Sequence, residues 1–465
     1  MRNRRSSLAL IILFFLPLAC NLPFVAKTPF AFNTPVGGVP AFEAAASQTA
    51  QATPSPTATP RIWPSPYFGS PGPTQVTPVP TPFPVLSNQE SVNFLLLGSD
   101  KRPNSSYRTD VIMIVSFQPA HQVVTLISVP RDLWVYVPGW QMQRINAAYQ
   151  HGDLGHYPGD GPEQIKDTIL FNLGIEIHHV ALVDFNGFKE IIDTLGGISV
   201  PLNCSFTDWH IIDPDKDDQD EDNWELYTIG PGVVQMDGDL ALWYARSRLR
   251  SSDYDRGRRQ QEVMRSIYSK ALQLNMLARI PELYREIGST VDTDMGLEDV
   301  LSLITLAPNL HSARIRSYYI NKDLITSWRT PQGGSVLLPN GPAIQGMLRK
   351  ALGPPDDLEN KKLNTFIEVW NGTNNANWDT LAIERLNYAG YEAQSAAADR
   401  NNYQQTLLYD FTTQQDQSQA IALLSVLGLS TSNLVSQPES ASSISYRLIV
   451  GRDYNPCFNP AAISR

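Results

Sequence analysis

The stretch VNFLLLGSD at residues 92–100 decides the fold, because an apolar run of strand length ends there in a polar turn. Two more strands are predicted close by, at residues 111–117 and 123–129. All three strands have charged residues at one end, and these are Asp100, Arg108, Asp110, Arg131 and Asp132. Two carboxylates held close together suit a hard cation such as magnesium, although an aspartate after a strand is also a common turn residue.

Apolar residues at helical spacing follow these strands, at residues 161–174 and 185–196. A strand-like run at residues 177–185 separates the two predicted helices. Such alternation of strands and helices favours an α/β sandwich over an all-β domain. We therefore predict the α/β class, with a mixed sheet in an α/β/α sandwich over residues 89–352.

The chain beyond residue 352 has the pattern of a second, smaller domain. Residues 353–363 are polar and contain two prolines, which predicts a linker. Strand-like and helical segments then alternate through residues 364–455, which predicts a small α/β domain. That segment has no cluster of reactive side chains, so we expect a binding or spacing module.

Residues 244–261, YARSRLRSSDYDRGRRQQ, contain six arginines and no lysine. Because a guanidinium group grips two phosphate or carboxylate oxygens at once, this composition favours a phosphate site. Arg246 and Arg248 alternate as on an extended segment. Arg256 and Arg259 are predicted to share a face at the start of a helix, where anions bind readily.

The arginine-rich stretch has a second interpretation, a solvated basic helix paired with Asp253 and Asp255. The chain as a whole has a formal net charge of -10, so it lacks the basic surface of a nucleic-acid-binding protein. We therefore expect no nucleic-acid partner.

Residues 1–20, MRNRRSSLALIILFFLPLAC, predict a signal for export. The apolar run at residues 8–16 is shorter than the roughly 20 residues that span a bilayer. The end of the segment resembles the lipobox of bacterial lipoproteins, in which Cys20 would be acylated; ordinary cleavage and an uncleaved anchor are the alternatives. We expect the protein at the outer face of the cytoplasmic membrane, held by acylated Cys20 or by an N-terminal signal anchor.

Residues 21–88 are rich in proline, threonine and serine and almost free of charge. Such a composition cannot bury enough apolar surface to fold, so a disordered stalk is predicted. If Cys20 is acylated, Cys204 and Cys457 remain as an even pair in an oxidising compartment. They either form a disulfide between the two predicted domains or stay as two free thiols.

Seven motifs together resemble the LytR-CpsA-Psr family, in the order in which that family has them. They are GSDKR (98–102), RTD (108–110), VPRD (129–132), RINAAYQHG (144–152), DFNGFKEIIDTLGGISV (184–200), YARSR (244–248) and DRGRRQQ (255–261). Members of the family are extracytoplasmic phosphotransferases that move a glycopolymer from a polyprenyl-pyrophosphate carrier onto peptidoglycan. Residues 364–455 are similar to the LytR C-terminal-type domain that some members carry.

The resemblance also implies a set of site residues. Asp100 and Asp110 would bind Mg²⁺, or Mn²⁺, and would form the catalytic set with Arg108 and Arg131. The residues that would hold pyrophosphate are Arg102, Arg246, Arg248, Arg256, Arg259 and Gln260. The family holds the lipid tail in an apolar cavity, for which the candidates here are Ile169, Leu170, Ile191, Ile192 and Leu195. Their spacing fits plain core equally well.

Two other functions use the same residues. A polyprenyl-pyrophosphate pyrophosphatase would differ only in taking water as the acceptor. A non-catalytic protein that binds the lipid carrier would keep the arginines but would not need both Asp100 and Asp110. The joint presence of the two aspartates favours an enzyme.

Overall fold

The structure is a computed structural model of the chain and describes residues 78–86, 91–100, 107–213, 216–217, 219–248, 253–273, 291–304, 310–412, 417–439 and 442–457. Within these ranges, no helix is both long enough and apolar enough to cross a membrane. The predicted export signal at residues 1–20 lies outside the described residues and stays a prediction.

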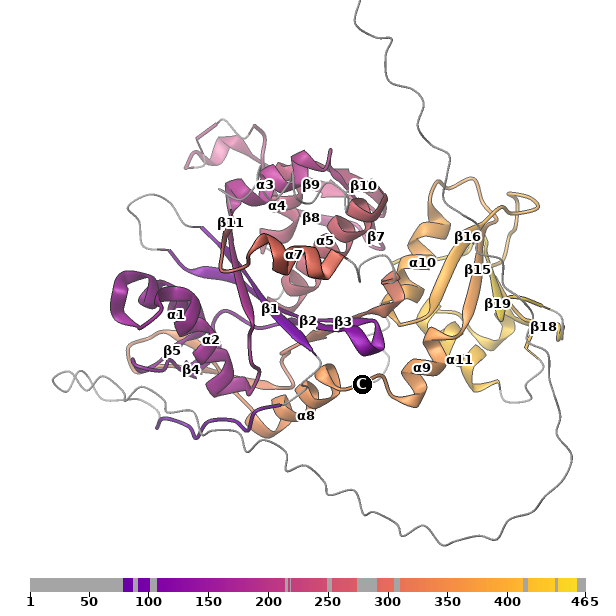
Figure 1. Cartoon of the computed structure of the whole chain (residues 1–465). Coiled ribbons are helices and arrows are strands. Elements are labelled where there is room, and N and C mark those ends of the chain that lie inside the picture. Colours follow the sequence, from indigo (N-terminus) through magenta and orange to yellow (C-terminus); the bar gives the residue numbers. More distant parts are fainter. Residues whose placement is uncertain are drawn as a thin grey trace, which may run out of the picture. The chain divides into compact units, whose positions relative to one another are not determined.

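A six-stranded mixed sheet, in the order β11-β6-β1-β2-β3-β12, forms the centre of the fold. Figure 1 labels its strands β1, β2, β3 and β11. Its strands are β1 (Val92–Ser99), β2 (Thr109–Gln118), β3 (Val123–Ser128), β6 (His179–Asp184), β11 (Val291–Thr293) and β12 (Ile315–Tyr319). β1 is antiparallel to β2 and parallel to β6. β3 is antiparallel to β2 and parallel to β12. The three strands predicted from residues 92–129 therefore form the middle of this sheet.

Helices cover both faces of the central sheet because side chains alternate along each strand. Leu95 and Leu97 face a core that includes α2 (Asp160–Leu173) and α8 (Gly341–Leu352). Met113 and Leu126 face the other side and pack against α5 (Asp253–Gln273). Figure 1 shows α5 and α8 on opposite sides of the sheet. This arrangement confirms the predicted α/β/α sandwich with a mixed sheet.

The described residues of this part also contain the helices α1 (Ala148–His151), α3 (Phe185–Thr194), α4 (Gly238–Arg246) and α7 (Leu297–Ile304). Four two-stranded sheets complete it: β4 (Trp134–Tyr136) with β5 (Met142–Arg144), β7 (Ile198–Leu202) with β10 (Gly232–Met236), β8 (Phe206–Ile211) with β9 (Trp224–Ile229), and β13 (Ile325–Arg329) with β14 (Ser335–Pro339). Residues of α3, α4, α5, β7 and β10 share a further hydrophobic core.

A second sheet of five strands follows, in the order β16-β15-β19-β17-β18. Its strands are β15 (Phe366–Asn371), β16 (Glu392–Ala396), β17 (Leu407–Asp410), β18 (Leu434–Ser436) and β19 (Tyr446–Val450). Helices α10 (Trp378–Tyr388) and α11 (Ser418–Leu427) contribute side chains to its core. The segment predicted as a linker contains a helix, α9 (Asp357–Leu363), because Asp356 and Glu359 form a capping box at its start.

The predicted stalk ends earlier than residue 88. Phe83 donates a backbone hydrogen bond to Phe171 (2.9 Å), and Leu86 donates one to Gly174 (2.8 Å), at the end of α2. Val79 packs against a hydrophobic cluster that includes Phe171. Residues 78–86 are therefore part of the folded structure, because their apolar side chains and backbone find partners there.

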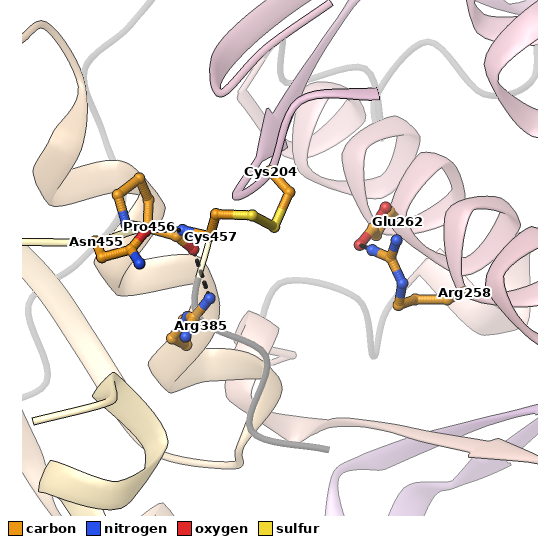
Figure 2. The surroundings of a disulfide bond; sticks show 7 residues. All are labelled: Cys204, Arg258, Glu262, Arg385, Asn455, Pro456 and Cys457. Carbon is orange, nitrogen blue, oxygen red and sulfur yellow. Dashed lines mark hydrogen bonds and ion pairs between the residues drawn. A yellow bond between two sulfur atoms is a disulfide. The ribbon is translucent and has the colours of Figure 1, made fainter. Parts of the chain in front are cut away.

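Cys204, after β7, is disulfide-bonded to Cys457, after β19 (Figure 2). Next to Cys457, the carbonyl of Pro456 accepts a hydrogen bond from the buried guanidinium of Arg385 (2.6 Å). The structure thus decides between the two alternatives for these cysteines in favour of the bridge. The covalent link joins the segment after β7 to the end of the second sheet.

Candidate active site

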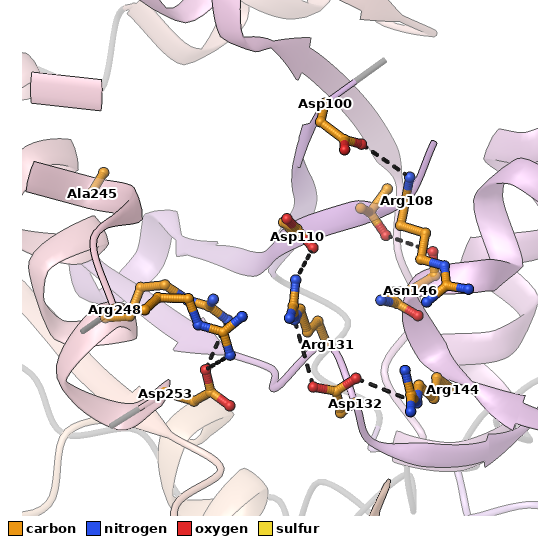
Figure 3. Close-up of polar contacts among 12 residues, drawn as sticks. Asp100, Arg108, Asp110, Arg131, Asp132, Arg144, Asn146, Ala245, Arg248 and Asp253 are labelled. Atoms are coloured by element: carbon orange, nitrogen blue, oxygen red, sulfur yellow. Dashed lines mark hydrogen bonds and ion pairs between the residues drawn. The ribbon is translucent and has the colours of Figure 1, made fainter. Parts of the chain in front are cut away.

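The charged ends of β1, β2 and β3 lie at one edge of the central sheet. Ser99, the last residue of β1, pairs with Thr109, the first residue of β2. Ser128, the last residue of β3, pairs with Met113 near the start of β2. This antiparallel pairing brings together the residues that follow or begin these strands, namely Asp100, Asp110 and Arg131 (Figure 3).

Asp110 lies at a β-bulge. Gly98 pairs with Val111 and Ser99 pairs with Thr109, so Asp110 is left out of the ladder with β1. A bulge bends a strand locally and changes the direction of a side chain. A Cβ at Gly98 would lie 2.9 Å from Val111 Cγ2, so only glycine lets the two strands approach this closely. The local structure therefore sets the direction of the Asp110 carboxylate.

Arg131 joins Asp110 to a second carboxylate, Asp132 (Figure 3). Its Nη1 donates to Asp110 Oδ1, and its Nε lies 3.5 Å from Asp132 Oδ2. Arg144, in β5, extends the chain of ion pairs with its Nε 3.4 Å from Asp132 Oδ1. Our sequence reasoning did not name Arg144, although it is the first residue of the RINAAYQHG motif. Asp132 therefore lies between two guanidinium groups.

Asp100 interacts with the backbone on the other strand. Its Oδ1 accepts a hydrogen bond from the N–H of Arg108 (3.3 Å). Both Asp100 and Arg108 are exposed. The Asp100 carboxylate therefore remains accessible to a ligand.

Arg248 and Arg256 share one carboxylate, that of Asp253. Asp253 Oδ1 lies 2.8 Å from Arg248 Nη2 and 3.1 Å from Arg256 Nη2. The side chain of Arg256 is only 8% exposed, whereas that of Arg248 is 44% exposed. In Figure 3, Arg248 points toward the Asp110–Arg131 pair. The pairing with Asp253 agrees with the solvated-helix interpretation, but the burial of Arg256 does not.

The protonation equilibria reflect the crowding of these charges. Burial alone would lower the pKa of Arg131, but the hydrogen bond and charge of Asp110, with Asp132 and Asp253, raise it overall. Burial lowers the pKa of Arg256, and the positive charges of Arg248 and Arg131 add to this effect against the attraction of Asp253. Positive charge at Arg256 is therefore only partly compensated, which favours an anionic ligand.

Arg259 is buried and holds the backbone that carries the other arginines. It is 1% exposed and donates hydrogen bonds to the carbonyls of Tyr244 and Ser247. Its guanidinium also lies 4.3 Å from the centre of the Phe206 ring. Gln260 Nε2 donates to the carbonyl of Ala245 (3.3 Å). Both side chains of α5 thus fix the end of α4.

We predicted that Arg246 lies on an extended segment, and this was wrong. Arg246 is the last residue of α4. The helix forms because Asp237 caps it by accepting a hydrogen bond from the N–H of Leu240 (2.9 Å). The Arg246 guanidinium lies 3.9 Å from the centre of the ring of Phe185, which is the first residue after β6. Because β6 is parallel to β1, this contact brings Arg246 to the same sheet edge.

The remaining predicted site residues are less clearly assembled. Arg102 lies outside the described residues. Ile169 belongs to the core between the central sheet and the helices α2 and α8. Ile192 and Leu195 belong to the core around α3 and α4. Leu170 is buried and Ile191 half-buried. The five lipid-tail candidates are therefore divided between different parts of the fold.

Two carboxylates at the sheet edge are the candidates for holding a magnesium ion. Mg²⁺ binds to one or two protein carboxylates and takes its other ligands from water and phosphate. Asp100 and Asp110 supply two such carboxylates from neighbouring strand ends. Among the described residues there is no group of three or more His, Cys, Asp or Glu side chains placed to hold a metal.

Residues 69–351 match the sequence model of the LytR_cpsA_psr family. Two similar proteins carry the name polyisoprenyl-teichoic acid–peptidoglycan teichoic acid transferase TagU. The protein of Enterococcus faecalis is 30% identical over 221 residues, 46% of this chain and 65% of that protein. The protein of Oceanobacillus iheyensis is 28% identical over 223 residues, 48% of this chain and 64% of that protein. The match thus covers less than two thirds of either relative.

Among solved structures, TagV of Bacillus subtilis resembles this chain with a TM-score of 0.46 and 23% identity. The alignment covers 57% of this chain and 98% of the TagV chain.

Proposed function

Because this chain belongs to the LytR_cpsA_psr family, we propose that it transfers a glycopolymer phosphate from a polyprenyl-pyrophosphate carrier to peptidoglycan. Two TagU relatives are named as transferases of teichoic acid to peptidoglycan, which supports this class of reaction. The observation that carries the proposal is the sheet edge where two aspartates and several arginines from separate segments meet.

The reaction asks chiefly for positioning and charge stabilisation. The oxygen of an acceptor hydroxyl attacks the phosphorus that bears the glycopolymer. The bond from that phosphorus to the bridging oxygen breaks, and polyprenyl phosphate leaves with the electron pair. The hydroxyl proton passes to a base, for which Asp132 is a candidate because it lies beside Arg131 at the same edge.

The arginines would neutralise the two phosphates. Arg248 and Arg256 both pair with Asp253, whose charge also raises the pKa of Arg131. We therefore propose that these three arginines act on one pyrophosphate. Arg108 and Arg246 lie at the same sheet edge and would add charge from two further sides. Arg102 is proposed for the same role from the motif alone. Each charge-assisted hydrogen bond contributes about 1.5–3 kcal/mol, so the loss of one arginine should weaken the reaction without abolishing it.

Arg259 and Gln260 would act through the backbone that they hold. Their bonds to the carbonyls of Tyr244, Ser247 and Ala245 keep Arg246 and Arg248 in place. We therefore assign Arg259 a positioning role in pyrophosphate binding.

Asp100 and Asp110 would hold Mg²⁺ or Mn²⁺ between them. A bound ion supplies charge stabilisation to the pyrophosphate oxygens. The Asp110 carboxylate also pairs with Arg131, so this aspartate would serve both the metal site and the arginine site.

The lipid carrier and the membrane complete the proposal. For the lipid tail we propose Ile169, Leu170, Ile191, Ile192 and Leu195, on the strength of the family resemblance alone. Anchoring at the outer face of the cytoplasmic membrane, through acylated Cys20 or a signal anchor, would bring the site to its lipid substrate.

The partition of products between acceptors tests the function. The full chain in detergent is incubated with Mg²⁺ and a polyprenyl-pyrophosphoryl disaccharide, with and without peptidoglycan fragments. The proposal predicts a phosphodiester-linked product that forms only with the fragments. Release of the sugar phosphate to water whatever acceptor is offered would instead establish a pyrophosphatase, and tight binding without turnover would establish a carrier-binding protein.

A further inference from the structure

The second sheet has one face packed against helices and another face that lines a pocket. Ile367, Val369 and Leu448 belong to the core that contains α10 and α11. Because neighbouring side chains on a strand point to opposite faces, Glu368 and Arg447 lie on the other side. A pocket of about 540 Å³ lies there, which is within the range of about 300–1,000 Å³ typical of ligand sites.

One row of side chains crosses the floor of this pocket. Arg447 pairs in register with Glu368 on one neighbouring strand and with Tyr409 on the other. Its Nε lies 2.5 Å from Glu368 Oε2, and its guanidinium lies 4.2 Å from the centre of the Trp370 ring. The same guanidinium lies 5.3 Å from the centre of the Phe411 ring. The floor is therefore rigid before any ligand binds.

Aromatic rings and polar groups alternate around the pocket. Tyr409 stacks beside Phe411, with ring centres 6.4 Å apart. At the rim, the Tyr403 hydroxyl donates to Asp399 (2.8 Å). Trp370 Nε1 is shielded from solvent and has no acceptor among the described residues. Sugars present apolar C–H faces and hydroxyl edges, and rings beside hydrogen-bonding groups match both.

The charge of the lining restricts the kind of glycan. The pocket has three carboxylates, those of Glu368, Asp399 and Glu439, and one guanidinium, that of Arg447. Arg400 lies nearby, over the Tyr403 ring, and still leaves the balance negative. A polymer rich in phosphate would meet like charges there. The lining therefore fits an uncharged sugar chain better than an anionic one.

We propose that this pocket binds the glycan strand of the acceptor through its uncharged N-acetylglucosamine units, at a place separate from the pyrophosphate site. The identity of this glycan as the acceptor rests on the proposed function, whereas the binding of an N-acetylated sugar chain does not. The second sheet would then raise the local concentration of acceptor hydroxyl groups without touching the reacting atoms.

Calorimetric titration of the full chain tests the proposal. The probes are a tetramer of N-acetylglucosamine and a poly(glycerol phosphate) of similar length. We expect the tetramer to bind and Tyr409→Ala to weaken it about tenfold, which is 1.4 kcal/mol. Glu439→Ala changes an exposed residue and should also weaken binding without affecting the core. Tyr227→Ala, at a 36% exposed position on β9 outside the pocket, is the control and should leave binding unchanged.

The proposal would be overturned if the Tyr409→Ala and Glu439→Ala variants bound the tetramer as tightly as the wild type does. A preference of the wild type for the phosphate polymer would also overturn it. Tetramer binding that depends on Tyr409 would support it even if no donor turnover is found, in which case only the proposed function fails. Transfer to peptidoglycan without any tetramer binding would support the proposed function and overturn the proposed glycan site.

Discussion

Asp253 is predicted to compete with pyrophosphate for the same guanidinium groups. Its Oδ1 binds both Arg248 and Arg256. Asp253→Asn would remove the negative charge and leave the shape nearly unchanged. The variant should therefore be less stable without ligand and should bind pyrophosphate more tightly.

The burial of the two arginines sets the size of the effect. Arg256 is 8% exposed, so losing its charged partner should lower the free energy of unfolding by about 1.5–3 kcal/mol. Arg248 is 44% exposed, and solvent screening limits its share to less than about 1 kcal/mol. If pyrophosphate takes over the freed hydrogen bonds, its affinity should rise about ten- to a hundredfold, at 1.4 kcal/mol for each factor of ten.

Urea unfolding would measure the stability, and calorimetric titration with inorganic pyrophosphate and Mg²⁺ would measure the affinity. Asp239→Asn is a matched control, because Asp239 is 50% exposed and pairs with Lys189 instead. Asp239→Asn should leave both the free energy of unfolding and the affinity for pyrophosphate nearly unchanged. Unchanged stability together with weaker pyrophosphate binding in Asp253→Asn would refute the reasoning.

Three further predictions concern the framework of the site. Cys204→Ser should lower the free energy of unfolding by about 2–4 kcal/mol, measured by urea unfolding beside the wild type with and without reductant, because it removes the bond to Cys457. Arg259→Lys should weaken pyrophosphate binding more than tenfold in calorimetry while leaving a folded chain, because a lysine cannot hold two carbonyls in the same geometry; unchanged affinity would contradict its positioning role. Phe83→Ala should make residues 78–86 exchange amide hydrogens faster, as followed by mass spectrometry, and equal exchange would show that the side chain does not hold this segment.

The centre of the fold could be predicted because its signals are local. Leu95 and Leu97 alternate with Phe94 and Leu96, and charged residues lie at one end of each of the three strands. Antiparallel neighbours then have their ends at the same edge, which brings Asp100 near Asp110. Strand length and charge placement therefore predicted which charged residues meet at this edge.

Features that depend on distant partners were harder to predict. The spacing of Arg246 and Arg248 fits a strand, and only the cap at Asp237 shows that a helix reaches Arg246. Residues 78–86 have a stalk's composition, and their order comes from backbone bonds to the end of α2.

Whether this sheet edge catalyses the transfer can be measured as the rate at which the full chain forms acceptor-linked phosphosugar while Mg²⁺ is varied. Wild type, Asp110→Asn and the control Asp239→Asn are compared. We expect Asp110→Asn to lower the rate at least about a hundredfold at every Mg²⁺ concentration, because the variant would lose both the proposed metal ligand and the charged partner of Arg131. A rate in Asp110→Asn equal to that of Asp239→Asn, with the same Mg²⁺ dependence, would contradict the assignment of this sheet edge as the catalytic site.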